Sequence, residues 1–310
     1  MTIKIYLAGS TGLVGSAVLN RLKELGHKNI ITRTRAELDL TNQNEVYDFF
    51  SKERPTHTIL AAAKVGGIIA NSLYQADFIR KNLLIQTNVI DAAKIYGCKK
   101  FCFLGSSCIY PKLCQQPIKE EYLLTGELEE TNAAYATAKI AGIQMINSYR
   151  KQYGLNGYYS LMPTNLFGER DNFNLETSHV LPALIRKFHE AKINGSDFVI
   201  IYGTGSAYRE FLFSEDIGKI ICSTLFMGDV PKLMNVGAGK DITIANLATL
   251  IKDIVGFSGE IRYDGSKPDG TPRKLLDVSK MEKLGLKADT SLEDGIRKTY
   301  KWYMKNCNSI

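Results

Sequence analysis

A tyrosine and a lysine four positions apart, Tyr135 and Lys139, are the residues of this chain whose spacing could do chemistry. Four residues make about one turn of an α-helix, so the phenol and the ammonium would lie on one helix face. The surrounding segment, N-A-A-Y-A-T-A-K-I-A-G, contains small or helix-favouring residues and predicts such a helix. A fixed ammonium favours the phenolate form of a neighbouring tyrosine. The pair could exchange a proton with a carbonyl oxygen, although the same spacing also occurs where side chains simply pack.

A glycine-rich turn near the N-terminus predicts a cofactor site. Gly9, Gly12 and Gly15 follow a predicted strand over residues 3–8 and open a predicted helix over residues 13–25. Glycines let the backbone approach a pyrophosphate closely, and the helix N-terminus adds N–H donors and a positive dipole end. Between a strand and a helix, the triplet predicts dinucleotide binding. A glycine turn without a ligand is the alternative.

Two arginines after the second predicted strand, residues 29–32, indicate which cofactor to expect. NAD-binding loops commonly carry an acid at this point for the ribose 2′-hydroxyl. Arg33 and Arg35 offer guanidinium groups instead, and their fork of donors matches the oxygens of a 2′-phosphate. We therefore expect NADPH rather than NADH, the alternative being that one or both arginines are only solvated.

The elements that must position these residues predict an α/β protein. The chain has 310 residues, 45% of them apolar and 23% charged, which is typical of a globular protein with room for two lobes. Short β-rich runs alternate with helical patterns in the first half, as in a Rossmann-type doubly wound parallel sheet. The pattern loosens after Pro163, and we expect a smaller C-terminal α/β substrate lobe. The predicted division assigns 1–165 to the NADP-binding domain, with a return segment near 205–240, and 166–204 plus 241–310 to the lobe.

Further elements are predicted by hydrophobic periodicity and by capping residues. Ser291 and Asp294 resemble a capping box that begins a last helix ending near Trp302. The other predicted strands are 58–63, 100–104 and 160–163, and the other predicted helices are 76–96, 133–149, 181–191 and 242–255.

Composition argues against several other classes of protein. No run of about 18 apolar residues occurs, so no membrane span is expected. The N-terminus lacks the pattern of a secretory signal, and none of the six cysteines forms a C-x-x-C pair, which together suggest a reducing cytoplasm and no metal site. The net charge of +7 fits an anionic ligand or simply surface lysines. Basic residues are scattered, which argues against nucleic-acid binding.

Five strings of the sequence resemble one family. The chain is similar to the GDP-L-fucose synthases of the extended short-chain dehydrogenase/reductase superfamily, and the similarity runs from Ile3 to about Trp302. The glycine loop, G-S-T-G-L-V-G, lacks a basic residue of bacterial members, which weakens the expectation of phosphate contacts from this loop. The five strings are A-A-A-K-V-G-G-I, G-S-S-C-I-Y-P-K, Y-A-T-A-K-I-A-G, M-P-T-N-L-F-G and S-K-P-D-G-T-P-R-K-L-L-D.

The resemblance implies an NADPH-dependent 3,5-epimerase and 4-reductase that acts on GDP-4-keto-6-deoxy-D-mannose. Ser106 would hydrogen-bond the substrate oxygen, Tyr135 would donate a proton to it, and Lys139 would bind the nicotinamide ribose. The base and acid of the epimerisation map onto Cys108 and His179. A ketone at C4 acidifies the protons at C3 and C5, and inversion needs a base on one face and an acid on the other. We expect nearby positive charge to favour the Cys108 thiolate, the alternatives being a buried structural cysteine and an ordinary loop histidine.

The resemblance also implies residues that bind the cofactor and the substrate. Asp39 and Leu40 look like the pair that contacts adenine. The expected substrate contacts are Asn165, Lys187, Tyr202, Arg209 and Asp269, where Tyr202 replaces a common tryptophan and Lys187 could instead be a solvated charge. The expected cofactor contacts are Gly9, Ser10, Thr11, Gly12, Leu13, Val14, Gly15, Arg33, Arg35, Asp39, Leu40, Leu104, Gly105, Ser106, Lys139, Pro163, Asn165, Leu166 and His179.

Other interpretations stay open at this point. The substrate could be another nucleotide-linked 4-keto sugar such as a GDP-heptose, although Cys108 and His179 argue against a pure reductase. The intact Ser106, Tyr135 and Lys139 argue against a binding protein on an inactive dehydrogenase scaffold. Helices 76–96 and 133–149 resemble the pair that forms a four-helix dimer interface in this superfamily, so we expect a homodimer, with packing against their own sheet as the alternative.

Overall fold

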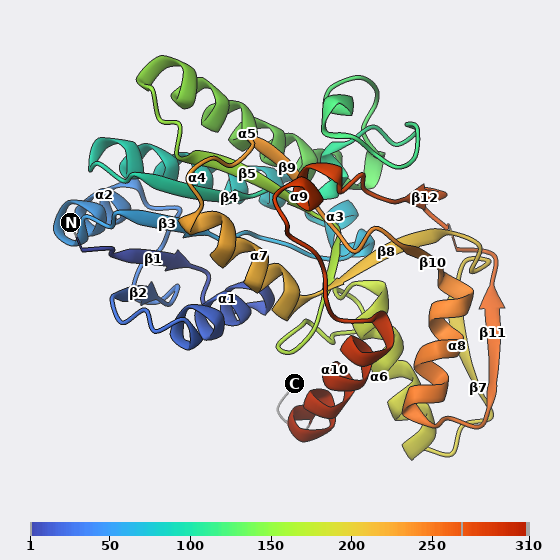
Figure 1. Cartoon of the computed structure of the whole chain (residues 1–310). Helices are drawn as coiled ribbons and strands as arrows, with labels where there is room; N and C mark the ends of the chain where they lie inside the picture. Colours follow the sequence, from blue (N-terminus) through green and yellow to red (C-terminus); the bar gives the residue numbers. More distant parts are fainter. Residues whose placement is uncertain (1, 268, 308–310) are drawn as a thin grey trace.

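A six-stranded parallel sheet forms the centre of the chain, in a computed structural model that describes residues 2–267 and 269–307. Its strand order is β2-β1-β3-β4-β5-β9, as Figure 1 shows. Strands buried on both faces are typical of a parallel sheet between helices, and every residue of β1, β5 and β9 is buried. The strands are β1 (Ile5–Ala8), β2 (Ile30–Arg33), β3 (His57–Leu60), β4 (Lys100–Leu104), β5 (Tyr158–Pro163) and β9 (Leu233–Val236).

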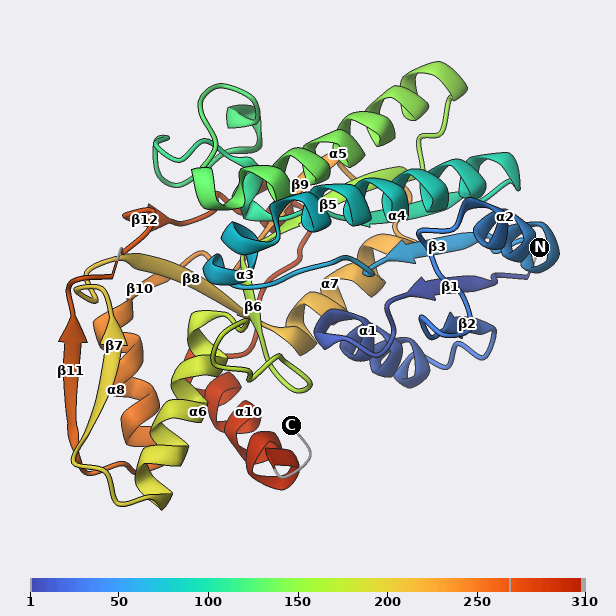
Figure 2. The ribbon, with the colours of Figure 1, turned by 180° about the vertical axis from the view of Figure 1, so that it is seen from behind.

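Helices cover both faces of this sheet. The long helices α4 (Gln75–Ile95) and α5 (Ala133–Tyr153) run side by side on one face, in front of the sheet in Figure 2. On the other face α1 (Leu13–Glu24) packs against α7 (Ser214–Phe226). This arrangement confirms the predicted doubly wound sheet. It also places the turn after β1, where the glycine loop lies, at the carboxyl edge beside the turn after β3.

The glycine loop needs its glycines for close packing. Gly9 has φ +85°, and a Cβ on it would lie 2.7 Å from the backbone nitrogen of Ala62, in the segment after β3. A Cβ on Gly15 would lie 2.0 Å from the carbonyl oxygen of Gly9. The first turn of α1 therefore approaches the end of β1 as closely as a backbone can.

A second group of elements lies beyond the carboxyl edge of the sheet, in the lower part of Figure 1. Its helices are α6 (Val180–Ile193), α8 (Ile244–Val255) and α10 (Leu292–Asn306), and they bury a separate hydrophobic cluster that includes Phe188, Leu247 and Ile296. Ser291 caps α10 by accepting a hydrogen bond from Asp294 N at 3.1 Å, as the capping pattern predicts. The strands of this region are β6 (Asn165–Phe167), β7 (Phe198–Tyr202), β8 (Tyr208–Phe213), β10 (Asp241–Thr243), β11 (Glu260–Asp264) and β12 (Arg273–Lys274).

These six strands form two small sheets. Strand β8 lies at the centre of the first, where it pairs with β10, β12 and β6, and β7 pairs in parallel with β11 in the second. The remaining helical segments are α2 (Gln43–Glu53), α3 (Ile68–Leu73), α9 (Ser279–Lys283), and the short 3-10 turns η1 (Ser107–Ile109), η2 (Glu120–Tyr122) and η3 (Glu130–Asn132).

The structure differs from the sequence prediction in several segments. Strand β6 occupies part of a predicted loop, because three residues extend to pair with β8, which lies far away in the sequence. The predicted strand 58–63 ends at Leu60, and α3 lies before the predicted helix 76–96. The domain division remains a prediction. Leu212–Val236 of the predicted return segment contributes to the core of the sheet, and so do Leu276, Val278, Met281 and Leu286 of the predicted lobe.

Candidate active site

Helix α5 carries Tyr135 and Lys139 on the face that meets β4. Lys139 is buried, and its Nζ donates a 2.8 Å hydrogen bond to the carbonyl oxygen of Leu104, the last residue of β4. The same Nζ lies 4.9 Å from the ring centroid of Phe103 and 5.8 Å from that of Tyr135. Burial lowers the pKa of Lys139 to about 8. An ammonium in this position is held between the sheet edge and the tyrosine.

Ser106 and Tyr135 come together at the carboxyl end of β4. Burial raises the pKa of Tyr135, the neighbouring Cys108 adds to that rise, and a hydrogen bond with Ser106 opposes it. Burial has the largest effect on this pKa, and the expected bias toward phenolate does not overcome it. A phenol that keeps its proton at neutral pH can donate one to an oxygen.

Cys108 lies in η1, directly after the serine pair. It is 8% exposed, and its backbone nitrogen donates to the hydroxyl of Ser106 at 3.4 Å. Burial raises the pKa of the Cys108 thiol, while Lys274, Ser106 and Lys139 oppose the rise. Desolvation thus outweighs the positive charges around the sulfur and disfavours the expected thiolate, while the role of Cys108 stays a prediction.

Lys274 is a site residue that the sequence prediction missed. Strand β12 pairs with β8 so that Lys274 lies opposite Arg209. Burial lowers the pKa of Lys274, and the Cys108 sulfur is the first group that opposes this shift. Lys274 belongs to the string S-K-P-D-G-T-P-R-K-L-L-D, which resembles the family. Spacing along the chain cannot show that this lysine acts on Cys108, which lies far upstream.

His179 immediately precedes helix α6, an element separate from those that carry Cys108 and Tyr135. Its φ of −76° and ψ of 165° make it the N-cap residue, although its side chain makes no capping hydrogen bond. The residue is exposed, yet desolvation by the surrounding protein lowers the pKa of its imidazole. Within residues 2–267 and 269–307, no hydrogen bond or ring contact joins His179 to Cys108 or Tyr135.

The glycine loop fits a dinucleotide. Helix α1 begins at Leu13 after the N-cap residue Gly12, which has no side chain, so its first N–H groups have no side-chain acceptor. Thr11 and Gly12 are exposed, and the tight packing of Gly9 and Gly15 leaves the surface above the helix N-terminus free of side chains from these positions. A pyrophosphate binds to such a helix N-terminus. Ser10 is buried, and Leu13 and Val14 are half-buried in the first turn.

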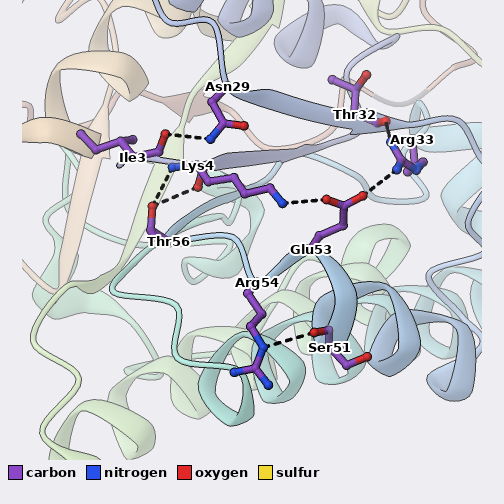
Figure 3. Close-up of polar contacts among 9 residues, drawn as sticks. All are labelled: Ile3, Lys4, Asn29, Thr32, Arg33, Ser51, Glu53, Arg54 and Thr56. Carbon is purple, nitrogen blue, oxygen red and sulfur yellow. Dashed lines mark hydrogen bonds and ion pairs between the residues drawn. The ribbon is translucent and has the colours of Figure 1, made fainter. Parts of the chain in front are cut away.

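The two arginines expected at the 2′-phosphate differ in their surroundings. Arg33 Nη2 lies 3.0 Å from Glu53 Oε1, and Glu53 also pairs with Lys4 at 2.8 Å, as Figure 3 shows. The Arg33 guanidinium also lies over the ring of Phe49, 5.4 Å from its centroid. Arg35 is exposed and makes no hydrogen bond or ion pair with another described residue. Of the two, Arg35 has the free donors that a phosphate would need.

The remaining predicted cofactor contacts lie along the same edge of the sheet. Asp39 closes a turn by accepting hydrogen bonds from Thr41 N and Oγ1, at 2.9 and 2.8 Å. Asn165 Nδ2 donates to the carbonyl oxygen of Glu210 at 2.8 Å, which ties β6 to β8. Gly105 follows β4, Pro163 is the last residue of β5, and Leu166 lies in β6. Leu40 lies between β2 and α2.

Four of the five predicted substrate contacts form two pairs in the second group of elements. Lys187 Nζ lies 4.2 Å from the ring centroid of Tyr202 and donates to the carbonyl oxygen of Ile200 at 3.0 Å. Both side chains line a surface hollow of about 460 Å³. Arg209 Nη2 donates to the carbonyl oxygen of Asp269 at 3.4 Å.

The Asp269 side chain holds a neighbouring turn. Its Oδ1 accepts from Thr204 N at 2.7 Å, and its Oδ2 accepts from Thr204 Oγ1 at 2.8 Å. Because Thr204 follows β7, this contact places the Asp269 loop next to Tyr202. Tyr202, Arg209 and Asp269 thus lie in β7, β8 and the segment before β12, and Lys187 reaches β7 from α6.

The sequence predicts neither a metal site nor a membrane span. Over residues 2–267 and 269–307, no group of His, Cys, Asp and Glu side chains could hold a metal ion. No helix formed by these residues is long and apolar enough to cross a membrane.

Comparison with known proteins places the chain in a family. Residues 5–237 match the model of the NAD dependent epimerase/dehydratase family. The chain is 55% identical over 306 residues to GDP-L-fucose synthase 1 of Arabidopsis thaliana, which covers 98% of this chain and 94% of that relative.

Two solved structures are similar over almost the whole chain. The crystal structure of a GDP-6-OMe-4-keto-L-xylo-heptose reductase from C. jejuni superposes with a TM-score of 0.92 at 38% identity, covering 98% of each chain. A GDP-L-fucose synthetase from Naegleria fowleri bound to NADP superposes with a TM-score of 0.91 at 30% identity, covering 100% of this chain and 97% of that one. The chain therefore belongs to the NAD dependent epimerase/dehydratase family, among the GDP-L-fucose synthases.

Proposed function

We propose that this chain converts GDP-4-keto-6-deoxy-D-mannose into GDP-L-fucose by 3,5-epimerisation followed by NADPH-dependent 4-reduction. The observation that carries the proposal is the assembly of Ser106, Cys108, Tyr135 and Lys139 at the carboxyl end of β4. A proton donor for the C4 oxygen and a thiol for the neighbouring carbons thus share one site. The 55% identity to a GDP-L-fucose synthase supports the same conclusion.

The cofactor would lie across the glycine loop and the carboxyl edge of the sheet. Residues 9–15 would face the pyrophosphate, Arg35 would bind the 2′-phosphate, and Lys139 would meet the nicotinamide ribose. Bound NADPH supplies the hydride that reduces C4. The close packing of Gly9 and Gly15 supports this placement.

In the reduction, Tyr135 donates its phenolic proton to the C4 oxygen, so that the ketone becomes an alcohol. Ser106 donates a hydrogen bond to the same oxygen, which places the carbonyl carbon and orients the ketone. Lys139, fixed on Leu104 O, provides positive charge near the phenolate that remains. The raised pKa of Tyr135 suits a group that must hold its proton until the oxygen develops charge.

In the epimerisation, a proton is removed from C3 or C5 on one face and returned on the other. Cys108 as thiolate takes the proton, the C4 oxygen holds the resulting negative charge as an enolate, and His179 delivers a proton to the opposite face. The separate positions of Cys108 in η1 and His179 before α6 support roles on two faces. Lys274 stabilises the thiolate, because a nearby cation lowers the free energy of the charged form.

The nucleotide part of the substrate would lie along β7 and β8. Lys187 and Arg209 would bind the diphosphate, Tyr202 would pack against guanine or ribose, and Asp269 would hold the loop that closes over the nucleotide. Asn165 would lie between the sugar and the cofactor. The adjoining positions of these residues support one continuous binding surface.

The organisation of the molecule is part of the proposal. We assign residues 1–165, with the return segment near 205–240, to NADP binding and the other segments to the substrate. The parallel pair α4 and α5 would form a homodimer interface. A cytoplasmic enzyme fits the reduced cysteines Cys98, Cys102, Cys108, Cys114 and Cys222.

A second candidate is an epimerase/reductase or reductase for another nucleotide-linked 4-keto sugar. The observation in its favour is the TM-score of 0.92 to a reductase of a GDP-linked 4-keto-heptose. Cys108 and His179 favour an enzyme that still epimerises.

The test is incubation with GDP-4-keto-6-deoxy-D-mannose and NADPH, with identification of the product by NMR. GDP-L-fucose is the expected product, and in D2O it should carry deuterium at C3 and C5. A 4-reduced sugar that keeps the manno configuration, or no turnover with this substrate, would contradict the proposal. A GDP-linked 4-keto-heptose offered in parallel discriminates the second candidate.

A further inference from the structure

The string A-A-A-K-V-G-G-I, residues 61–68, received no role from the reaction described above. We propose that Gly66, Gly67 and Asn71, named here the 66–71 platform, position His179 for its part in the epimerisation. This inference rests on the proposed function, because it concerns the residue that protonates the sugar in that reaction. It assigns no chemistry to the platform, whose residues act through His179.

The platform meets the loop of His179 backbone to backbone. Gly67 N donates a 2.8 Å hydrogen bond to the carbonyl oxygen of Thr177. A Cβ on Gly67 would lie 2.4 Å from the carbonyl oxygen of Ser178 and 3.2 Å from its carbonyl carbon. Backbone atoms cannot swing aside as the end of a side chain can. Only glycine therefore allows this contact, although the φ of −67° at Gly67 would suit any residue.

His179 must follow Ser178 because the loop is fixed at both ends. Ser178 N donates to the carbonyl oxygen of Asn174 at 2.9 Å, which closes a turn before the contact. Ala183 N donates to the carbonyl oxygen of His179 at 3.1 Å, which begins helix α6. Helix α6 is anchored by the fully buried side chains of Ile185 and Phe188. If Ser178 is displaced, the peptide that joins it to His179 must therefore move with it.

Asn71 fixes the backbone of the other two platform residues. It is 4% exposed, and its Nδ2 donates to the carbonyl oxygens of Gly66 at 2.6 Å and Gly67 at 3.0 Å. One buried side chain within α3 thus holds both carbonyls just before this helix. A buried amide committed to two neighbouring carbonyls defines a single orientation of the Gly66–Gly67 peptide.

The platform is also linked to Tyr135, through the side chain of Phe78. A Cβ on Gly66 would lie 3.2 Å from Cζ of Phe78, near the start of α4. Phe78 packs edge-on against Tyr135, with ring centroids 6.3 Å apart and an interplanar angle of 86°. Figure 2 shows α3 lying between the start of α4 and β6. The platform therefore joins the element that carries Tyr135 to the loop that carries His179, and it sets the distance between the two proton donors.

The test uses Gly67→Ala, with Gly228→Ala as the matched control. Gly228 lies outside the platform and the site, and a Cβ there meets no atom within 4 Å. Epimerisation is measured as deuterium entry at C3 and C5 of GDP-4-keto-6-deoxy-D-mannose in D2O, with NADP+ bound so that no hydride is transferred. Reduction is measured in reverse, as NADPH formation from GDP-L-fucose and NADP+. Gly67→Ala should slow deuterium entry by about a hundredfold, since misplacement by about 1 Å costs that much. It should leave the KM for both sugars and the reverse reduction within about threefold of wild type.

A spectroscopic readout separates positioning from general damage. The chain has four histidines, so the imidazole signals can be resolved by NMR and that of His179 assigned with His179→Gln. In Gly67→Ala the His179 signal and its pH titration should shift, while those of His27, His57 and His189 stay as in wild type. Asn71→Ala is the second variant, because it releases the two carbonyls without introducing a clash, and it should produce the same pattern.

The outcomes distinguish this inference from the proposed function. Wild-type deuterium entry and an unshifted His179 signal in both variants would overturn the platform. Equal losses of deuterium entry and reverse reduction would overturn it too, since they indicate general damage. If the wild-type chain shows no deuterium entry, or His179→Gln retains it, the epimerase proposal fails. In that case the position of the His179 signal in the two variants still shows whether the platform positions this residue.

Discussion

The ammonium of Lys139 is hydrogen-bonded to the carbonyl oxygen of Leu104 at 2.8 Å, and lies 5.8 Å from the ring centroid of Tyr135. The bond fastens α5 to the carboxyl end of β4. Lys139 therefore has a fixed place in the sheet edge before any ligand binds, and it provides charge near Tyr135 without a direct bond to the phenol. This geometry has consequences for both stability and catalysis.

Lys139→Met should change how stability depends on pH. The pKa of Lys139 is about 8 in the folded chain and 10.5 for an ordinary lysine. Between these values the unfolded chain binds a proton that the folded chain has lost, so wild-type stability gains up to about 3 kcal/mol as pH rises through this window. The variant lacks this gain. Urea unfolding of both proteins at pH 7.5 and at pH 10.5 should show the difference widening in favour of wild type. A difference independent of pH would contradict the lowered pKa.

Tyr135→Phe should stop reduction and spare the other steps. Removal of the phenolic proton donor should lower NADPH oxidation by at least about a hundredfold. NADPH binding, followed by fluorescence titration, and deuterium entry at C3 and C5 should remain close to wild type. Tyr153→Phe, at the far end of the same helix, is the control. Substantial NADPH oxidation by Tyr135→Phe would exclude this residue as the acid.

The rate of deuterium entry should form a broad plateau between two pH limbs. The pKa of His179 is lowered and that of Cys108 is raised, so the pair of imidazolium and thiolate is a minor species whose fraction stays constant between the two values. The rate falls below the lowered pKa because thiolate is lost faster than imidazolium is gained, and above the raised pKa because imidazolium is lost.

Lys274→Met should move only the alkaline limb of this profile. Without the Lys274 ammonium the pKa of the Cys108 thiol rises further, so the limb shifts to higher pH and the plateau drops. Lys287→Met is the control, because Lys287 is exposed and pairs at 3.2 Å with Asp289, away from the sulfur. An unchanged alkaline limb in Lys274→Met would mean that this lysine does not act on Cys108.

Arg35→Ala should raise the KM for NADPH by about tenfold and leave the KM for NADH nearly unchanged, because a 2′-phosphate contact is charge-assisted. Arg33→Ala is the matched comparison. Its guanidinium pairs with Glu53 at 3.0 Å in a partly exposed position, so we expect a loss of less than about 1 kcal/mol in the free energy of unfolding and little change in cofactor preference. Steady-state kinetics with both cofactors checks this, and a wild-type preference that already favours NADH would refute the 2′-phosphate site.

The sequence by itself determined the parts of this protein that depend on short separations. The spacing of Tyr135 and Lys139 follows from one helical turn, and the glycine loop follows from a strand, a turn and a helix in direct succession. The alternation of elements predicted the doubly wound sheet, since short strands linked by helices have few other ways to bury both faces.

Tertiary structure alone decided the contacts between distant segments. Lys274 acts on the pKa of Cys108 because β12 pairs with β8. Gly67 packs against Ser178 because α3 lies against the loop before α6. The balance of forces on each side chain is likewise a property of the folded chain. Arg33 forms an ion pair with Glu53, and burial raises the pKa of the Cys108 thiol despite the cations around it. Desolvation and ion pairing depend on every neighbour in space, and spacing along the chain carries no record of those neighbours.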